Sequence, residues 1–150
     1  MKADLNIGLD NTFLGVGQGL RNAYVRYYFD EKALANSEIK MWIKFMDKQG
    51  VLKSGIPKLS EYTSRYAENG ILGLIIFLSP SIVLIFKFLR KIRIDNGNDK
   101  LCFITMLVSL IGMMASGIGD SINVTYCYWV LLGLGYAMCL GEQKEKVDNE

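Results

Sequence analysis

The sequence predicts an all-α integral membrane protein, with three transmembrane helices preceded by a helical extracytoplasmic segment. Three uncharged apolar runs fill most of the second half, a Lys/Arg cluster follows the first, and 51% of the 150 residues are hydrophobic. Runs of this length can cross a bilayer as helices and are costly to expose to water. We expect residues 1–69 to be extracytoplasmic and residues 70–140 to hold spans at about 70–90, 101–119 and 123–140. Residues 141–150 would be a cytoplasmic tail. The alternative is a buried hairpin of a soluble helical protein.

A glycine-rich turn lies near the start of the first region. Gly15, Gly17 and Gly19 stand in the run GVGQG. The helix predicted after it has one face made of Leu20, Tyr24, Tyr27 and Tyr28. A glycine turn that leads into a helix can present N–H groups to a phosphate, or it can be a structural turn at the membrane surface. No strand pattern precedes the glycines, so a dinucleotide-binding fold is excluded.

A second helix is predicted in the middle of the first region. Asn36 or Ser37 is a suitable N-cap, and Gly50 marks the end. Its apolar stripe consists of Ile39, Trp42, Ile43 and Met46, with Lys40, Lys44 and Lys48 on the other side. This stripe could lie on the membrane surface or pack against the spans. After a break at residues 55–57, Ser60 is a suitable N-cap for the helix that becomes the first span.

Charge sets the predicted orientation of the spans. Residues 71–86 carry no charge, and Lys87, Arg90, Lys91 and Arg93 follow at once. Because Lys and Arg accumulate on the cytoplasmic side, this end is expected inside and the residues before Gly70 outside. The second and third uncharged runs, 101–119 and 124–140, are joined by a tight turn at 120–123. The second span then runs from inside to outside and the third returns, which places the tail inside.

Export of the first region poses a problem. Residues 1–10 have no apolar central run, so no secretory signal peptide is predicted. The region nevertheless carries ten Lys and Arg residues, which makes unaided translocation by the first span difficult. We therefore expect the chain to be the C-terminal part of a longer multi-span protein. The remaining N-terminal spans of that protein would be a partner.

Composition excludes several classes of function. The formal net charge is +2 and no basic patch stands out, which argues against nucleic acid as a partner. The chain has no histidine, and Cys102, Cys127 and Cys139 all fall within predicted spans. We therefore expect no disulfide framework, no metal site and no cofactor. No span contains an ionisable residue, which argues against a transporter fragment.

Three arginines stand out in the first region. Arg21 and Arg26 flank the predicted tyrosine face, and Arg65 is spaced to pair with Glu61 and Glu68 on one helix surface. A solvated ion-pair surface is the simplest interpretation of these charges. Arginines, tyrosines and a glycine turn at a membrane interface also suit a substrate with phosphate and sugar groups. Arginine contacts phosphate oxygens bidentately, and tyrosine rings offer flat surfaces to sugars.

Two short motifs carry a resemblance to a known family. They are LGVGQG at residues 14–19 and SRYAENGILGLIIFL at residues 64–78, followed by two more spans. The chain resembles the C-terminal third of the O-antigen ligase and polymerase superfamily. These are bacterial multi-span glycosyltransferases whose large external loop begins near a G-V-G turn and ends in a helix resembling L-x-E-x-G-x-x-G. The matching residues are Gly15, Val16 and Gly17, then Ala67, Glu68, Gly70 and Gly73.

The ligase branch has a more specific pattern. It contains a histidine, then Asn, Ser or Gln, then nine residues and G-x-x-G. Ser60 and residues 61–73 fit this pattern, but Leu59 stands at the histidine position. The departure counts against a ligase, which remains an alternative.

The resemblance implies metal-independent transfer of glycan repeat units from polyprenyl diphosphate carriers at the outer face of the bacterial cytoplasmic membrane. The product would be O-antigen, capsule or exopolysaccharide, and the lipid-linked oligosaccharide and the bilayer would be partners. Loop arginines would hold the diphosphate, as fixed positive charge stabilises the leaving group. The expected contacts are Arg21 and Arg65, then Arg26, with Gly15 and Gly17 in the turn. Glu68 is the candidate general base, and a structural or helix-capping role is the alternative.

A non-catalytic protein is the other hypothesis. Members of that superfamily have about ten or more spans, and three cannot enclose a substrate cavity. The chain would then be a remnant of such an enzyme or a three-span scaffolding partner.

Overall fold

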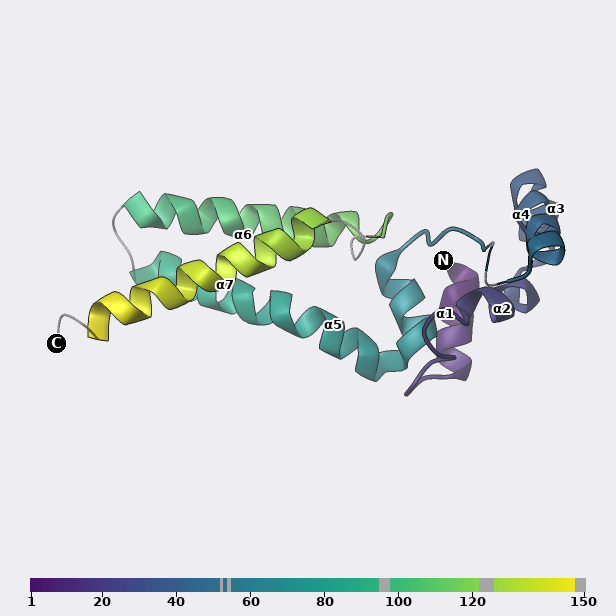
Figure 1. The fold of residues 1–150 in the computed structure, drawn as a ribbon, viewed down its shortest axis with the longest axis horizontal. Coiled ribbons are helices and arrows are strands. Elements are labelled where there is room, and N and C mark those ends of the chain that lie inside the picture. The colour runs from purple at the N-terminus through teal and green to yellow at the C-terminus, as the bar shows by residue number, and fades with distance from the viewer. Residues whose placement is uncertain (52, 54, 95–97, 122–125, 148–150) are drawn as a thin grey trace. The chain divides into compact units, whose positions relative to one another are not determined.

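The computed structural model describes residues 1–51, 53, 55–94, 98–121 and 126–147. Within these residues every regular element is helical, which confirms the all-α prediction (Figure 1). The chain divides into two compact units, Met1–Ile76 and Phe77–Glu150. Helix α5, Glu61–Ile94, contributes residues to both.

The first unit is built from short helices and the start of α5. These are α1 (Lys2–Asp10), α2 (Arg21–Val25), the 3₁₀ turn η1 (Arg26–Tyr28), α3 (Glu31–Ala35) and α4 (Ser37–Gln49). Their core consists of Ala3, Ile7, Val25, Met46, Ile56 and Ala67. Helix α1 was not predicted, although Ala3 and Ile7 have the i, i+4 spacing of a buried helix face. Helix α1 supplies two of these residues, α2, α4 and α5 supply one each, and η1 and α3 supply none, so packing across the unit holds these short helices.

Helix α4 confirms the predicted amphipathic helix. The Asn36 side chain accepts a hydrogen bond from the Glu38 N–H at 2.8 Å, and Gly50 ends the helix at φ +84°. Met46 is buried, and Trp42 and Ile43 pack against the same core. The predicted stripe therefore covers the core of its own unit. Neither a membrane surface nor the spans are needed to account for it.

The predicted tyrosine face is not kept as one surface, because Tyr28 packs against the core of the unit. The predicted helix is the five-residue α2 followed by η1. Arg21 and Val25 face the core, whereas Leu20, Tyr24 and Tyr27 are exposed. Arg21 is buried because its charge is matched inside the unit, as described below.

Helix α5 begins directly after Ser60, as predicted. It is interrupted at Gly70, where φ is +65° and ψ is −166°. Beyond Gly70 the helix is uncharged as far as Phe86 and contains Pro80. Together with α6 (Asn98–Ser116) it is long and apolar enough to cross a membrane, and the apolar part of α7 (Tyr126–Val147) is shorter, at Tyr126–Leu140.

The ends of α6 and α7 differ from the predicted spans. Helix α6 ends at Ser116 instead of residue 119, because residues 117–119 form a tighter turn whose N–H groups bond three residues back. Helix α7 continues to Val147, through most of the predicted tail. The predicted turn at residues 122–123 and the start of the third run at 124–125 lie outside the described residues.

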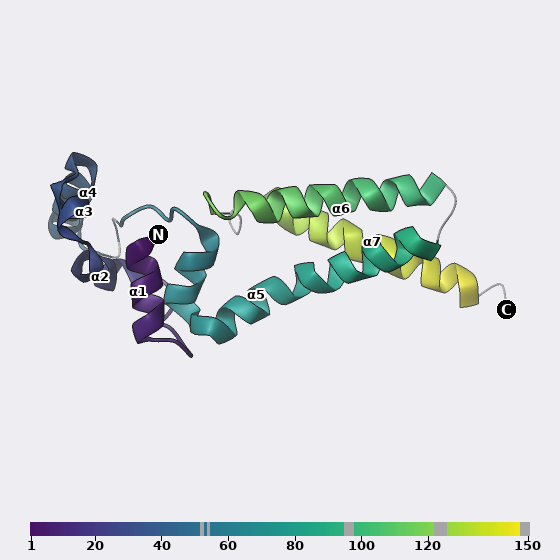
Figure 2. The ribbon, with the colours of Figure 1, turned by 180° about the vertical axis from the view of Figure 1, so that it is seen from behind.

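The second unit consists of the later part of α5 together with α6 and α7 (Figure 2), and its apolar core encloses a polar pair. The core residues come from α5, α6 and α7 and are Leu84, Phe88, Phe103, Leu110, Tyr128, Leu132 and Cys139. The Ser81 and Tyr128 hydroxyls are 2.6 Å apart and buried. The Tyr136 hydroxyl donates to the Pro80 carbonyl at 2.9 Å. Two tyrosines of α7 thus join α5 around its proline.

Tyr128→Phe should weaken the second unit. The change leaves the Ser81 hydroxyl without this partner in an apolar core, at a cost of about 0.5–2 kcal/mol. Tyr126→Phe is the matched control, because the Tyr126 side chain is 85% exposed. Unfolding of the full chain by denaturing detergent, followed by circular dichroism, measures the difference. Equal stability of the two variants would contradict a stabilising role for this hydrogen bond.

Candidate functional site

The break in α5 is closed by the loop that follows α1. In an uninterrupted helix the Ile71 N–H would donate to the Ala67 carbonyl. Here it donates instead to the Thr12 carbonyl at 2.8 Å. The Val16 N–H takes its place on the Ala67 carbonyl at 2.9 Å, and the Gly17 N–H donates to the Glu68 carbonyl at 2.8 Å. Residues 12–17 therefore satisfy backbone groups that the break leaves without helical partners.

Glycine is required on both sides of this contact. Gly15 and Gly70 have φ of +67° and +65°. A Cβ on Gly15 would overlap the backbone of Glu68, and one on Gly70 would overlap the backbone of Phe13. Both side chains are excluded by conformation and by space. The two motifs behind the family resemblance thus lie in direct backbone contact.

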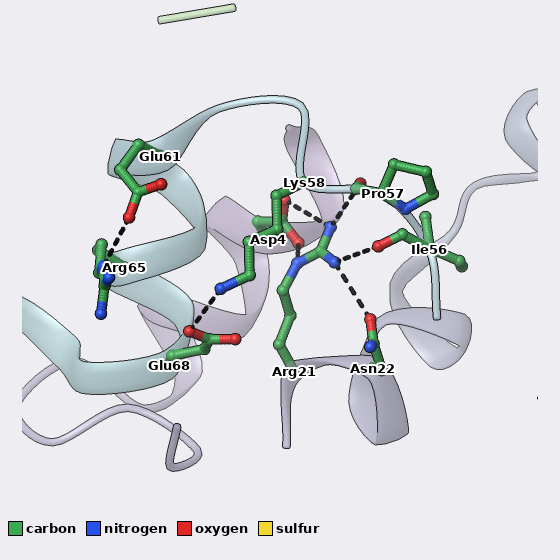
Figure 3. A network of polar contacts seen from close by, with 9 residues as sticks. All are labelled: Asp4, Arg21, Asn22, Ile56, Pro57, Lys58, Glu61, Arg65 and Glu68. Carbon is green, nitrogen blue, oxygen red and sulfur yellow. Dashed lines mark hydrogen bonds and ion pairs between the residues drawn. The ribbon is translucent and has the colours of Figure 1, made fainter. Parts of the chain in front are cut away.

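The side chain of Arg21 is held by five hydrogen bonds (Figure 3). Its Nε and Nη2 donate to the two oxygens of Asp4 at 2.6 and 3.1 Å. The Ile56 carbonyl accepts at 2.8 Å, the Asn22 side chain at 3.2 Å and the Pro57 carbonyl at 3.5 Å. A guanidinium has five N–H donors, so all are used. Asp4 is 0% exposed and Arg21 3%, so this is a buried ion pair that ties α1 to α2 and the segment before α5.

Two more ion pairs lie along the first turns of α5. Arg65 Nε donates to Glu61 at 2.7 Å, confirming the predicted i, i+4 pair. Glu68 instead pairs with Lys58, whose Nζ lies 2.8 Å from its Oε2 (Figure 3). The carboxylates of Glu61 and Glu68 are 1% and 3% exposed. The predicted solvated surface is therefore wrong for these carboxylates, because the unit folds over this side of the helix.

Arg26 is in a different environment. Its side chain is 39% exposed and pairs with Asp47 at 3.2 Å. Its guanidinium also lies 5.3 Å from the centre of the Tyr27 ring. The Tyr27 side chain is exposed, and so is that of Tyr24. Of the three predicted arginines, Arg26 is the most accessible from solvent.

Three N–H groups of the glycine turn donate to carbonyls within the first unit and are not presented to solvent. The N–H groups of Gly15, Val16 and Gly17 donate to the carbonyls of Asn11, Ala67 and Glu68. These bonds agree with the interpretation of this segment as a structural turn and not as an anion-binding turn. Anion binding by Gly15 and Gly17, and diphosphate binding by Arg21, stay predictions that would require these bonds to open.

Sequence reasoning missed two residues of this network, Asp4 and Lys58. Asp4 lies in a segment examined only as a leader, and Lys58 lies ten residues before its partner, outside any helical spacing. A local signal existed only for Asp4, which stands among the apolar residues of one α1 face.

Two groups at the edge of the unit have shifted pKa values. The Tyr28 hydroxyl donates to Asp10 at 2.7 Å, and this bond raises the pKa of Tyr28. The Ala33 N–H donates to Asp30, the N-cap of α3, and lowers the pKa of that carboxyl. The contribution of Asp30 to stability is thus present above its unfolded pKa and is lost as the pH falls through its folded pKa.

Comparisons with protein-family models, with curated proteins and with solved structures found no match to this chain.

Gly70→Ala should unfold the first unit. Alanine must adopt a conformation nearly confined to glycine and must also displace the Phe13 backbone. Gly50→Ala is the control, since Gly50 has φ +84° but open space around it. We expect Gly50→Ala to cost about 1–3 kcal/mol and Gly70→Ala to cost more, because the added Cβ would also overlap the Phe13 backbone. The measurement is protease protection of residues 1–76 in the full chain, and equal protection in both variants would exclude the close approach.

Arg21→Met should destabilise the first unit by about 3–5 kcal/mol, because it leaves Asp4 buried without its partner. The double variant Asp4→Leu/Arg21→Met should lose less unfolding free energy than the sum of the losses in the single variants Asp4→Leu and Arg21→Met. Urea unfolding followed by Trp42 fluorescence, in a Trp129→Phe background, gives the coupling energy. A double variant that is additive would show that the pair is not coupled.

Proposed function

We propose that this chain is part of a membrane polysaccharide polymerase that transfers glycan repeat units from polyprenyl diphosphate carriers at the outer face of the cytoplasmic membrane. The observation that carries the proposal is the backbone contact between residues 15–17 and residues 67–70. These are the two ends of the external loop in the family that the sequence resembles. A folded first unit on an apolar helix supports the same assignment.

The reaction requires a place for a diphosphate and for sugars. The acceptor hydroxyl attacks the anomeric carbon of the donor, the bond from that carbon to the diphosphate oxygen breaks, and the hydroxyl proton passes to a base. Fixed positive charge favours departure of the diphosphate. In the first unit we assign this role to Arg26, because its guanidinium is accessible and lies against the exposed ring of Tyr27.

The other predicted residues take different roles within this proposal. Arg21 holds the unit together through Asp4, and Arg65 is 12% exposed and paired with Glu61. Glu68 would serve as the base only after the Lys58 pair opens, because its carboxylate is 3% exposed. In this proposal Arg21 and Glu68 stabilise the fold around the site, and Arg26 contacts the substrate.

One observation favours the non-catalytic alternative. All three arginines predicted to bind substrate pair with carboxylates of the same unit. Ion pairs of this kind are sufficient to explain why arginine stands at these positions. In that case the first unit would be a scaffold on the membrane.

Arg26→Lys, introduced into the complete coding region and tested in a strain lacking the native copy, separates the two hypotheses. Lysine keeps the charge but loses the bidentate fork, so we expect about tenfold less long-chain polymer. Gel analysis of surface polysaccharide length and amount provides the measurement.

Two variants control this experiment. Arg90→Lys makes the same exchange on an exposed residue beyond the apolar run of α5 and should leave the polymer unchanged. Asp47→Asn breaks the Arg26 ion pair but keeps the guanidinium, and should also leave it unchanged. Normal polymer in the Arg26→Lys strain would remove Arg26 from the site. Normal polymer in a strain lacking the whole coding region would exclude the polymerase.

A further inference from the structure

The loop after α1 ends in two exposed apolar side chains. Phe13 is 72% exposed and Leu14 is 74% exposed. They lie in an uncharged stretch, residues 11–20, that is bounded by Asp10 and Arg21. Large apolar side chains side by side at a loop tip are unfavourable in water and indicate a contact surface.

The position of this tip is set by the break in α5. The Thr12 carbonyl accepts from the Ile71 N–H, and the Phe13 backbone lies against Gly70. Ile71 is the first residue of the uncharged run of α5. Phe13 and Leu14 are therefore held at the level where that run begins. Leu72, Ile75 and Ile76, in the next turns of the helix, are exposed as well.

Backbone carbonyls on the α1 side of this tip already accept hydrogen bonds within the unit. The Ile7 carbonyl accepts from both the Asn11 N–H and the Asn11 side chain, and the Leu9 carbonyl accepts from the Thr12 hydroxyl. The Asn11 and Thr12 carbonyls accept from Gly15 and Ile71. Backbone carbonyls left unpaired would oppose entry into a lipid environment.

We propose that residues 12–15 form an interfacial anchor, which inserts Phe13 and Leu14 into the headgroup and acyl boundary of the bilayer beside the end of α5. The occupant is lipid because the tip is tied to the first residue of an apolar helix long enough to span a membrane. A side chain at that level faces the boundary region wherever α5 crosses. The proposal rests on α5 crossing a membrane and not on the glycan chemistry, so either can fail without the other.

Site-directed spin labelling tests this anchor in the full chain. Cys102, Cys127 and Cys139 are replaced by Ser, and a single nitroxide is placed at Leu14→Cys or at Lys32→Cys. Lys32 is an exposed residue of α3, which lies on the far side of α1 and α2 from α5 (Figures 1 and 2). The protein is reconstituted in phosphatidylcholine and phosphatidylglycerol vesicles. Power saturation with oxygen and with a water-soluble nickel chelate then reports the depth of each label.

The label at position 14 should be more accessible to oxygen than to nickel, at a depth of about 5–10 Å, and the label at position 32 should show the reverse. Adding Phe13→Asp should shift the label at position 14 toward water. Because the substitution changes an exposed side chain, protease protection of residues 1–76 should remain. Equal nickel accessibility at positions 14 and 32, or a protein that does not enter the vesicles, would overturn the proposal.

Discussion

The fold of the first unit depends on a one-residue interruption of helix α5 at Gly70. At Gly70 the α5 backbone adopts φ +65° and ψ −166°, and the groups this exposes bond to residues 12–17. A continuous helix would pair the Ala67 carbonyl with Ile71 and leave no partners for that loop. Unpaired buried backbone groups are costly, so the loop and the break exist together or not at all. The fold of residues 1–60 around the start of α5 follows from this exchange of hydrogen bonds.

Buried charge adds specificity to that arrangement. Asp4 with Arg21 and Glu68 with Lys58 each join two different segments of the unit, and at least one member of each pair is almost fully buried. Such pairs contribute little net stability compared with apolar groups of the same size, but an incorrect arrangement leaves a charge without a partner. They therefore disfavour alternative packings of helices that are too short to specify one arrangement through their apolar contacts alone. The same pairs engage Arg21 and Lys58, two cations that could otherwise bind a phosphate. Arg26 is more accessible than either of them.

The parts of the fold that could be predicted are those encoded locally. The caps of α4, the start of α5 and the apolar runs follow from composition over one to five turns. The Glu61–Arg65 pair also follows from helical spacing. Helix α1 was missed because its signal is two apolar residues and an acid, and Arg21 was expected on a surface because its partner lies 17 residues away. Spacing indicated that residues 15–17 and 67–70 were special, but their contact depends on folding of the intervening 49 residues.

The backbone contact between the two motifs also constrains how the chain is made. Residues 12–17 are synthesised before residue 71, and at 5–20 residues per second this delay is roughly 3 to 12 s. During that time α1 and its loop lack the carbonyl and N–H partners supplied by α5. The segment that completes them is the start of the apolar run of α5. If α5 crosses a membrane, as we propose, folding of the first unit has to wait for insertion of this helix.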